Sequence, residues 1–187
     1  LIEKSGILSG NKAIIVDNDF KTTFNNVYAT GSVIELTDKI TNKKCIVSSF
    51  RESALLGRMA ADKVSDRTSY IYKGHIRNEF ICVKNLYVGI TGINEAEAKE
   101  NGFDAFSVSL FCGDSERFIS SKNQLYLKLL VDKLSRKVLG AQISGKNSSI
   151  DKRLDILYSC IYSELTVDDL ANLNLSYSPE TSLLKDP

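Results

Sequence analysis

The stretch Leu125–Val131 (LYLKLLV), with Asp132–Lys137 (DKLSRK) and Val138–Ile143 (VLGAQI) after it, decides the fold of the second half of this 187-residue chain. Two runs rich in Leu, Val and Ile flank a short charged segment. This pattern is typical of two antiparallel strands joined by a polar turn. It predicts a β-hairpin over residues 125–143.

The residues that precede this hairpin predict more strands and one helix. Residues 80–83 and 86–90 are rich in aromatic and β-branched side chains, which suit a pleated sheet. Phe106–Leu110 alternates apolar and polar residues, as a half-buried strand does. Between them, Asn94 has a glutamate three residues later, which is the spacing of a capping box. Gly102 can then end that helix in a left-handed conformation.

Two helices are expected after the hairpin. Apolar residues recur on one helical face at Ile150, Leu154, Leu157 and Ile161. Ser148 and Asp151 have residue types that favour the start of this helix. Thr166 and Asp169 favour the start of a shorter one that ends near Leu173. The second part of the chain is therefore expected to be α+β, with an antiparallel sheet flanked by helices.

The first part of the chain has a different pattern. Ala13–Val16 and Val27–Thr30 are predicted as strands, separated by a turn at Asn25-Asn26. Ser49, with Glu52 three residues later, predicts a helix start of the capping-box type. That helix has an apolar stripe formed by Leu55, Leu56, Met59 and Val64. A shift in composition over residues 65–69 places the domain boundary there, giving domains 1–66 and 67–187.

Charge and composition exclude several classes of protein. The chain has 24 basic and 23 acidic residues, a balance that argues against nucleic acid or an anionic membrane as the main partner. It has neither a signal-peptide pattern nor an apolar run of the roughly 20 residues that a membrane-spanning helix needs. Its four dispersed cysteines fit a reducing cytoplasm. His75 is the only histidine, so we expect no histidine-based metal site and interpret His75 as a surface or strand residue.

Four motifs in order give the chain a family resemblance. They are VYATGSV (27–33) with GRMAA (57–61), VGITGINEAEAKENGFD (88–104), LKLLVDKLSRKVLGAQISG (127–145) and LTVDDLANLNLSYSP (165–179). The set resembles the pyridine nucleotide-disulfide oxidoreductases, in particular the branch of NADH oxidases and coenzyme A-disulfide reductases. The resemblance implies that residues 67–187 are a dimerisation domain and that residues 1–66 end an FAD-binding α/β domain. The chain then looks like the C-terminal part of a larger flavoenzyme.

The resemblance also implies a set of site residues. Gly31 and Ser32 match the place where relatives have a glycine and an aspartate, whose carboxylate accepts a hydrogen bond from the ribityl chain of FAD. Val47 and Ser48 match the helix start whose amides face the flavin ring. Tyr177 is similar to tyrosines that reach across the dimer toward the redox cysteine of the partner. Each position also has a simpler interpretation: a tight turn, a helix cap and an aromatic side chain that packs on a neighbouring subunit.

The same resemblance sets expectations for activity and assembly. A full-length parent would be an oxidoreductase that uses FAD and NAD(P)H and forms a homodimer through residues 150–165 and 166–179. This chain has no Gly-x-Gly-x-x-Gly motif between a strand and a helix. Its cysteines do not match the redox motif of the family. We therefore expect the chain alone to bind neither cofactor and to be inactive. The alternative is a stand-alone interaction module with the same fold and no redox activity.

Overall fold

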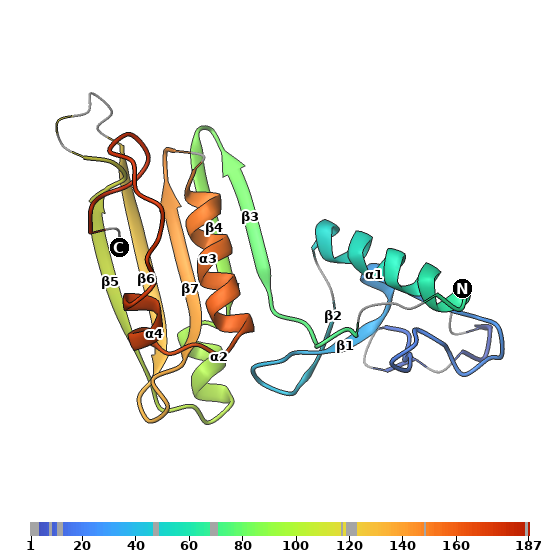
Figure 1. Cartoon of the computed structure of the whole chain (residues 1–187). Coiled ribbons are helices and arrows are strands. Elements are labelled where there is room, and N and C mark those ends of the chain that lie inside the picture. The colour runs from blue at the N-terminus through green and yellow to red at the C-terminus, as the bar shows by residue number, and fades with distance from the viewer. Residues whose placement is uncertain are drawn as a thin grey trace. The chain divides into compact units, whose positions relative to one another are not determined.

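The computed structural model describes residues 4–7, 9–10, 13–46, 49–67, 71–116, 118, 123–147, 149–185 and 187. The chain forms two compact units, Leu1–His75 and Ile76–Pro187 (Figure 1). The division into family domains at residues 66 and 67 stays a prediction. Among the described residues, no helix combines the length and the apolar character that a membrane crossing requires.

The described residues of unit 1, Leu1–His75, form a small sheet and a long helix. Strands β1 (Glu35–Thr37) and β2 (Lys44–Ile46) pair antiparallel, and a 3-10 helix, η2 (Gly31–Val33), precedes them. Helix α1 (Phe50–Val64) starts after Ser49, as the sequence predicts. Its buried side chains share a core with residues from the segment before it. The core residues are Phe20, Ile34, Leu36, Leu56, Met59 and Ala60.

The two strands predicted in this unit are wrong. Residues 13–16 and 27–30 form isolated bridges only: Ile14 pairs with Ser9 and with Ile34, and Tyr28 pairs with Lys21. An apolar run indicates burial, and Ala13 and Ile14 are indeed buried. Burial does not supply a partner that stays in register over several residues, which a strand requires. The short sheet forms instead from β1 and β2.

Unit 2, Ile76–Pro187, confirms the predicted α+β fold with an antiparallel sheet. Its five strands lie in the order β3-β4-β7-β6-β5, and every neighbouring pair is antiparallel (Figure 1). The strands are β3 (Asn78–Val83), β4 (Leu86–Gly92), β5 (Ala105–Gly113), β6 (Gln124–Asp132) and β7 (Val138–Gly145). The hairpin predicted over 125–143 is β6 and β7, at the centre of the sheet.

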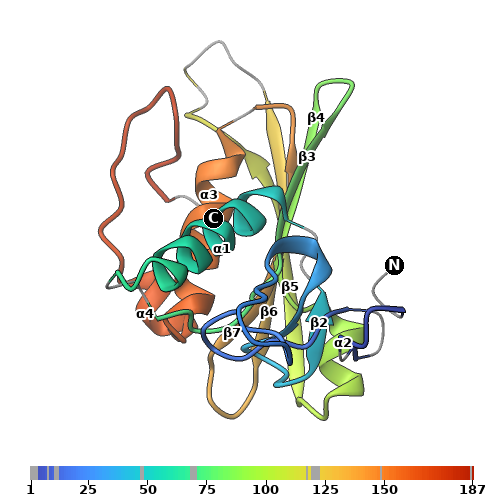
Figure 2. The ribbon, with the colours of Figure 1, turned by 90° about the vertical axis from the view of Figure 1, so that its right-hand side faces the viewer.

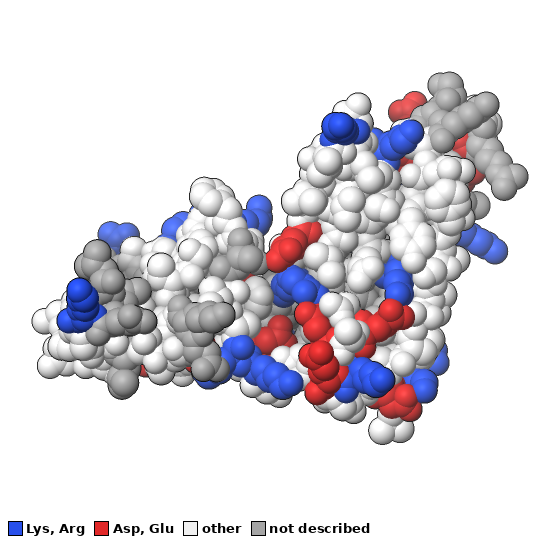
Figure 3. Space-filling view, turned by 180° about the vertical axis from the view of Figure 1, so that it is seen from behind, with Lys and Arg blue, Asp and Glu red and all other residues white. Residues whose placement is uncertain are grey.

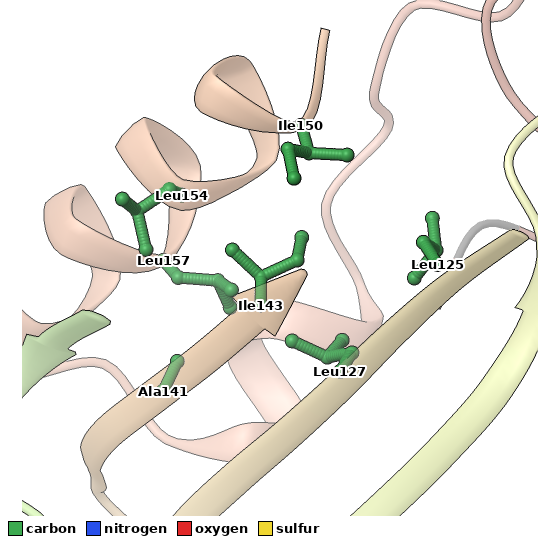
Figure 4. Close-up of a cluster of buried hydrophobic side chains, with 7 residues drawn as sticks. All are labelled: Leu125, Leu127, Ala141, Ile143, Ile150, Leu154 and Leu157. Carbon is green, nitrogen blue, oxygen red and sulfur yellow. The ribbon is translucent and has the colours of Figure 1, made fainter. Parts of the chain in front are cut away.

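Helix α3 (Ile150–Tyr162) covers one face of this sheet (Figures 1 and 2). Leu154 and Leu157 point from the helix toward Ile143 on β7 and Leu127 on β6 (Figure 4). Gly89 on β4 allows the close approach, because a Cβ atom at that position would lie 2.7 Å from Cδ2 of Leu154. The packed cluster comprises Leu125, Leu127, Ala141, Ile143, Ile150, Leu154 and Leu157.

The opposite face of the sheet is covered by α2 (Glu95–Glu100) at one end, and among the described residues much of the rest is exposed. Because side chains alternate along a strand, the residues beside Gly89 and Ile143 in sequence point away from α3. Figure 3 shows this face, where charged side chains gather toward the end that carries α2 (Glu95–Glu100). The large exposed apolar and aromatic side chains that point to this side include Ile81, Val83, Val88, Phe111 and Tyr126.

The caps of the shorter helices follow the sequence closely. Asn94 and Glu97 form both hydrogen bonds of a capping box at α2, and Gly102 has the expected left-handed φ of 77°. Thr166 and Asp169 form the same box at α4, which spans Val167–Ala171 and so ends two residues before the predicted Leu173. Ser148 lies outside the described residues.

Candidate functional site

The predicted flavin-facing turn is built around Gly31. This glycine is buried and has a left-handed φ of 80°, which makes a sharp turn at the start of η2, directly after Thr30. The next residue, Ser32, is exposed. The hydroxyl Oγ1 of Thr30 is buried and has no hydrogen-bond partner among the residues that the structure describes. A buried hydroxyl without a partner is costly, so the turn offers a polar group that a ligand could satisfy.

The turn lies next to the first turns of α1. A Cβ atom on Gly31 would come within 3.6 Å of Cβ of Ser53, and η2 and α1 contact each other. Ser49 caps the helix, and its side chain accepts a hydrogen bond of 3.3 Å from the backbone N–H of Glu52. The structure thus brings the turn and the helix start together. Val47 and Ser48 lie outside the described residues.

A polar cluster centred on Glu52 was missed by the sequence analysis. Its Oε1 accepts a hydrogen bond of 2.6 Å from the hydroxyl of Tyr72, and its Oε2 lies 2.7 Å from Nδ1 of His75. The carboxylate is therefore turned toward residues 72–75 and does not return to Ser49, which was the capping-box expectation. Of the two alternatives predicted for His75, the surface one is wrong, because His75 is only 5% exposed; His75 forms an isolated β-bridge with Asp38. Its backbone is tied to β1 through Thr37.

The four cysteines differ in their surroundings. Cys160 is buried, Cys45 and Cys112 are half-buried, and Cys82 is exposed; all four are free thiols. Burial, followed by the nearby charges of Asp38 and Glu52, raises the pKa of Cys45 to about 12. A thiol with such a pKa stays protonated near neutral pH, so Cys45 is a poor nucleophile.

Tyr177 lies in unit 2, in the exposed segment that follows α4. Its side chain is 46% exposed, and its hydroxyl donates a hydrogen bond of 3.4 Å to Oε1 of Glu116. Desolvation, and then the charge and the hydrogen bond of Glu116, raise the pKa of Tyr177 above its ordinary value. The phenol therefore keeps its proton at neutral pH and can act as a donor.

A separate hollow of about 320 Å³ lies in unit 1. Asp17, Glu35 and Asp38 line it together with Lys39 and Lys44. Neither Gly31 nor Ser32 contributes to this hollow. It has acidic and basic residues in similar number, and we assign no ligand to it.

Comparison of the chain with known proteins identifies its family. Residues 80–185 match the model of the dimerisation domain of the pyridine nucleotide-disulphide oxidoreductases. This match covers more than half of the chain and most of unit 2. The chain belongs to the pyridine nucleotide-disulphide oxidoreductase family.

Individual relatives extend the similarity to the first unit. The chain is 28% identical, over 99% of its length, to the coenzyme A disulfide reductase of Staphylococcus epidermidis. Its structure is similar to the NAD-dependent persulfide reductase of A. fulgidus, with a TM-score of 0.94 and 34% identity over the whole chain. It is equally similar in structure to the reduced CoADR-RHD of Bacillus anthracis, with a TM-score of 0.94 and 32% identity.

The chain spans only part of each relative. It covers 42% of the Staphylococcus epidermidis reductase and 34% of each of the two solved chains. It is therefore a region that contains the family's dimerisation domain and is related to coenzyme A disulfide reductases.

Proposed function

We propose that this chain is the C-terminal region of an FAD-dependent NAD(P)H oxidoreductase and that it supplies dimerisation and a flavin-contacting edge. The observation that carries the proposal is the collinear match of both units to coenzyme A disulfide reductase, which includes the Gly31 turn. The cofactors belong to the full-length parent in this proposal. A reducing cytoplasmic location is part of it, since all four cysteines are free.

The Gly31 turn has features that fit a flavin. The unpartnered hydroxyl of Thr30, the left-handed Gly31 and the exposed Ser32 are consecutive residues beside the first turns of α1. In this proposal Ser32 binds a hydroxyl of the ribityl chain, where relatives use an aspartate. A neutral serine should bind more weakly than a carboxylate, because hydrogen bonds to charged groups are the stronger ones. When bound, FAD would carry the electrons between NAD(P)H and the acceptor.

We further propose that the chain alone lacks the activity of the parent. Burial raises the pKa of Cys45 and of Cys160, whereas a redox-active cysteine needs a lowered pKa. The purified chain should therefore show no NADH oxidation and should lose FAD on desalting. Flavin absorbance that survives desalting, in an equimolar amount, would contradict this part of the proposal.

A chimera tests the flavin-contacting role directly. The matching region of the Staphylococcus epidermidis reductase is replaced by this chain, and the flavin content of the purified dimer is measured. We expect the chimera to retain FAD and the Gly31→Ala variant to lose most of it, since alanine disfavours a φ of 80°. Gly57→Ala on α1 is the matched control, because a Cβ atom there meets nothing within 4 Å. A folded, flavin-loaded dimer that is indifferent to Gly31→Ala would argue that this turn does not hold the cofactor.

A further inference from the structure

The segment after α4 is fixed to unit 2 although most of its side chains are exposed. We call residues 172–185 the C-terminal arm; the structure describes all of them, and they form neither a helix nor a strand after Asn172. Tyr177 lies in the middle of this arm. An exposed segment of this kind normally frays unless specific contacts hold it. Two side chains outside the arm, Glu116 and Arg153, supply such contacts.

Glu116 binds the arm at three places. Its Oε1 accepts a hydrogen bond of 2.8 Å from the backbone N–H of Leu184 and one of 3.4 Å from the hydroxyl of Tyr177. Its own backbone N–H donates a hydrogen bond of 3.1 Å to the carbonyl oxygen of Pro179. A single residue beyond the end of β5 thus contacts the arm at Tyr177, Pro179 and Leu184. Hydrogen bonds to a carboxylate are stronger than those between neutral groups.

Arg153 binds the arm from the side of α3. Its side chain is 8% exposed, and its Nη2 donates hydrogen bonds of 3.1 Å to the carbonyl oxygen of Asp114 and 3.3 Å to that of Thr181. A buried charged group is costly unless its donors are satisfied, so the Thr181 carbonyl is part of what makes this burial tolerable.

Asp114, whose carbonyl oxygen binds Arg153, is itself held by hydrogen bonds. Asp114 is 1% exposed, and its carboxylate accepts hydrogen bonds of 2.9 Å from Nδ2 of Asn147 and 3.1 Å from the hydroxyl of Ser115. The end of β5, the loop before α3 and the arm are therefore joined by one polar network. Undocking the arm would leave a buried guanidinium with one acceptor fewer.

We propose that Glu116 and Arg153 are positioning residues that dock the C-terminal arm and set the place of the Tyr177 hydroxyl. The docking is a property of unit 2 alone. What Tyr177 then does for a partner subunit rests on the proposed function. Because the hydroxyl is held by Glu116 in the free chain, a partner group that takes its hydrogen bond must compete with this carboxylate.

Hydrogen exchange and a tyrosine titration on the whole chain test this proposal. The amide of Leu184 should exchange about tenfold faster in Glu116→Ala, because it loses its acceptor. Glu116→Gln keeps an acceptor oxygen and should restore part of the protection. In both variants the pKa of Tyr177 should fall toward its ordinary value of about 10. The titration is followed by NMR of ¹³C-labelled tyrosine, with Tyr177→Phe identifying the signal.

Arg153→Met and Glu180→Gln complete the set. Arg153→Met should loosen the arm while the Glu116 carboxylate stays in place, so faster exchange of the Leu184 amide would indicate undocking. Glu180→Gln is the control: it removes the charge of an exposed residue within the arm, and it should change neither the exchange of Leu184 nor the titration of Tyr177. If Arg153→Met lowers the melting temperature so far that its exchange rates cannot be compared with those of the unmodified chain, the two Glu116 variants alone test the docking proposal.

Two results would overturn the docking proposal. One is a Leu184 amide in the unmodified chain that exchanges as fast as an unstructured peptide, or that is protected only at concentrations where the chain associates. The other is a Tyr177 titration that Glu116→Ala does not change. The mass in solution is measured on the same samples. A monomeric chain with a docked arm would count against the proposed dimer and would leave the positioning role intact.

Discussion

The carboxylate of Glu52 connects the start of α1 to a segment twenty residues further along the chain. Tyr72 and His75 both reach it, at 2.6 Å and 2.7 Å, and the side chain of His75 is almost fully buried. Removing the carboxylate takes one hydrogen bond from Tyr72 and removes the group that faces Nδ1 of the buried His75. The cost of leaving a buried polar group unsatisfied is about 1–3 kcal/mol.

Glu52→Ala should therefore lower the stability of unit 1 by at least about 1 kcal/mol. The measurement is native-state hydrogen exchange of the α1 amides, which reports the free energy of opening of that unit alone. Arg58→Ala, at an exposed position of the same helix, is the control and should change the exchange little. Equal exchange in the two variants would mean that the cluster does not stabilise the unit.

Thiol reactivity gives a second test at the scale of single residues. Because burial raises its pKa to about 12, Cys45 stays protonated at pH 8 and should react slowly. Cys160 is buried and its pKa is also raised, whereas Cys82 is exposed. Iodoacetamide at pH 8, followed by peptide mass spectrometry, should label Cys82 well before the other two. Labelling of Cys45 as fast as Cys82 would show that its surroundings are more open than described.

At the scale of the elements, the sequence predicted what local chemistry determines. The β6–β7 hairpin and the caps at Asn94 and Thr166 depend on residues a few positions apart, and all three are confirmed. The single bridges at Ile14 and Tyr28 depend on partners elsewhere in unit 1, and local pattern misassigned them as strands.

In the candidate site, too, local features were predictable from the sequence and contacts between distant residues were not. The tight turn at Gly31 was predictable because its motif is local, and its left-handed φ is observed, whereas its role toward a flavin stays a prediction. The contact between Glu52 and His75 spans 23 residues, and nothing in the spacing indicated it. The network of Arg153 with Asp114 and the arm was missed for the same reason, since it joins segments 28 to 39 residues apart.

The attachment of α3 to the sheet is the main packing contact of unit 2. Leu154 is 2% exposed and lies over Gly89 and Ile143. Leu154→Ala should lower the free energy of unfolding by about 2–5 kcal/mol, because the rigid sheet beneath it cannot collapse into the cavity. Urea unfolding followed by circular dichroism gives this value, with the exposed Asp155→Ala as control. A loss below about 1 kcal/mol would mean that α3 is loosely attached.

For the whole molecule, the two units should differ in their independence. Unit 2 contains a five-stranded sheet with its own core, whereas the described residues of unit 1 form a two-stranded sheet and a long helix. Small sheets need further packing for stability. A chain of residues 76–187 alone should therefore fold, with hydrogen exchange in β6 and β7 as slow as in the full chain. Equal protection of β6, β7 and α1 in the full chain would instead indicate one cooperative unit.

The measurement that tests the central claim most directly is the mass of the chain in solution. A dimerisation domain predicts twice the 20.7 kDa of one chain by light scattering at micromolar concentration. Ile156→Lys on the half-buried side of α3 should convert the dimer to a monomer, because it places a charge in the proposed interface. Ile81→Lys, on the face of the sheet that points away from α3, should leave the dimer intact. A mass of one chain that persists to high concentration would contradict the account, and dissociation by Ile81→Lys alone would place the interface on the opposite face.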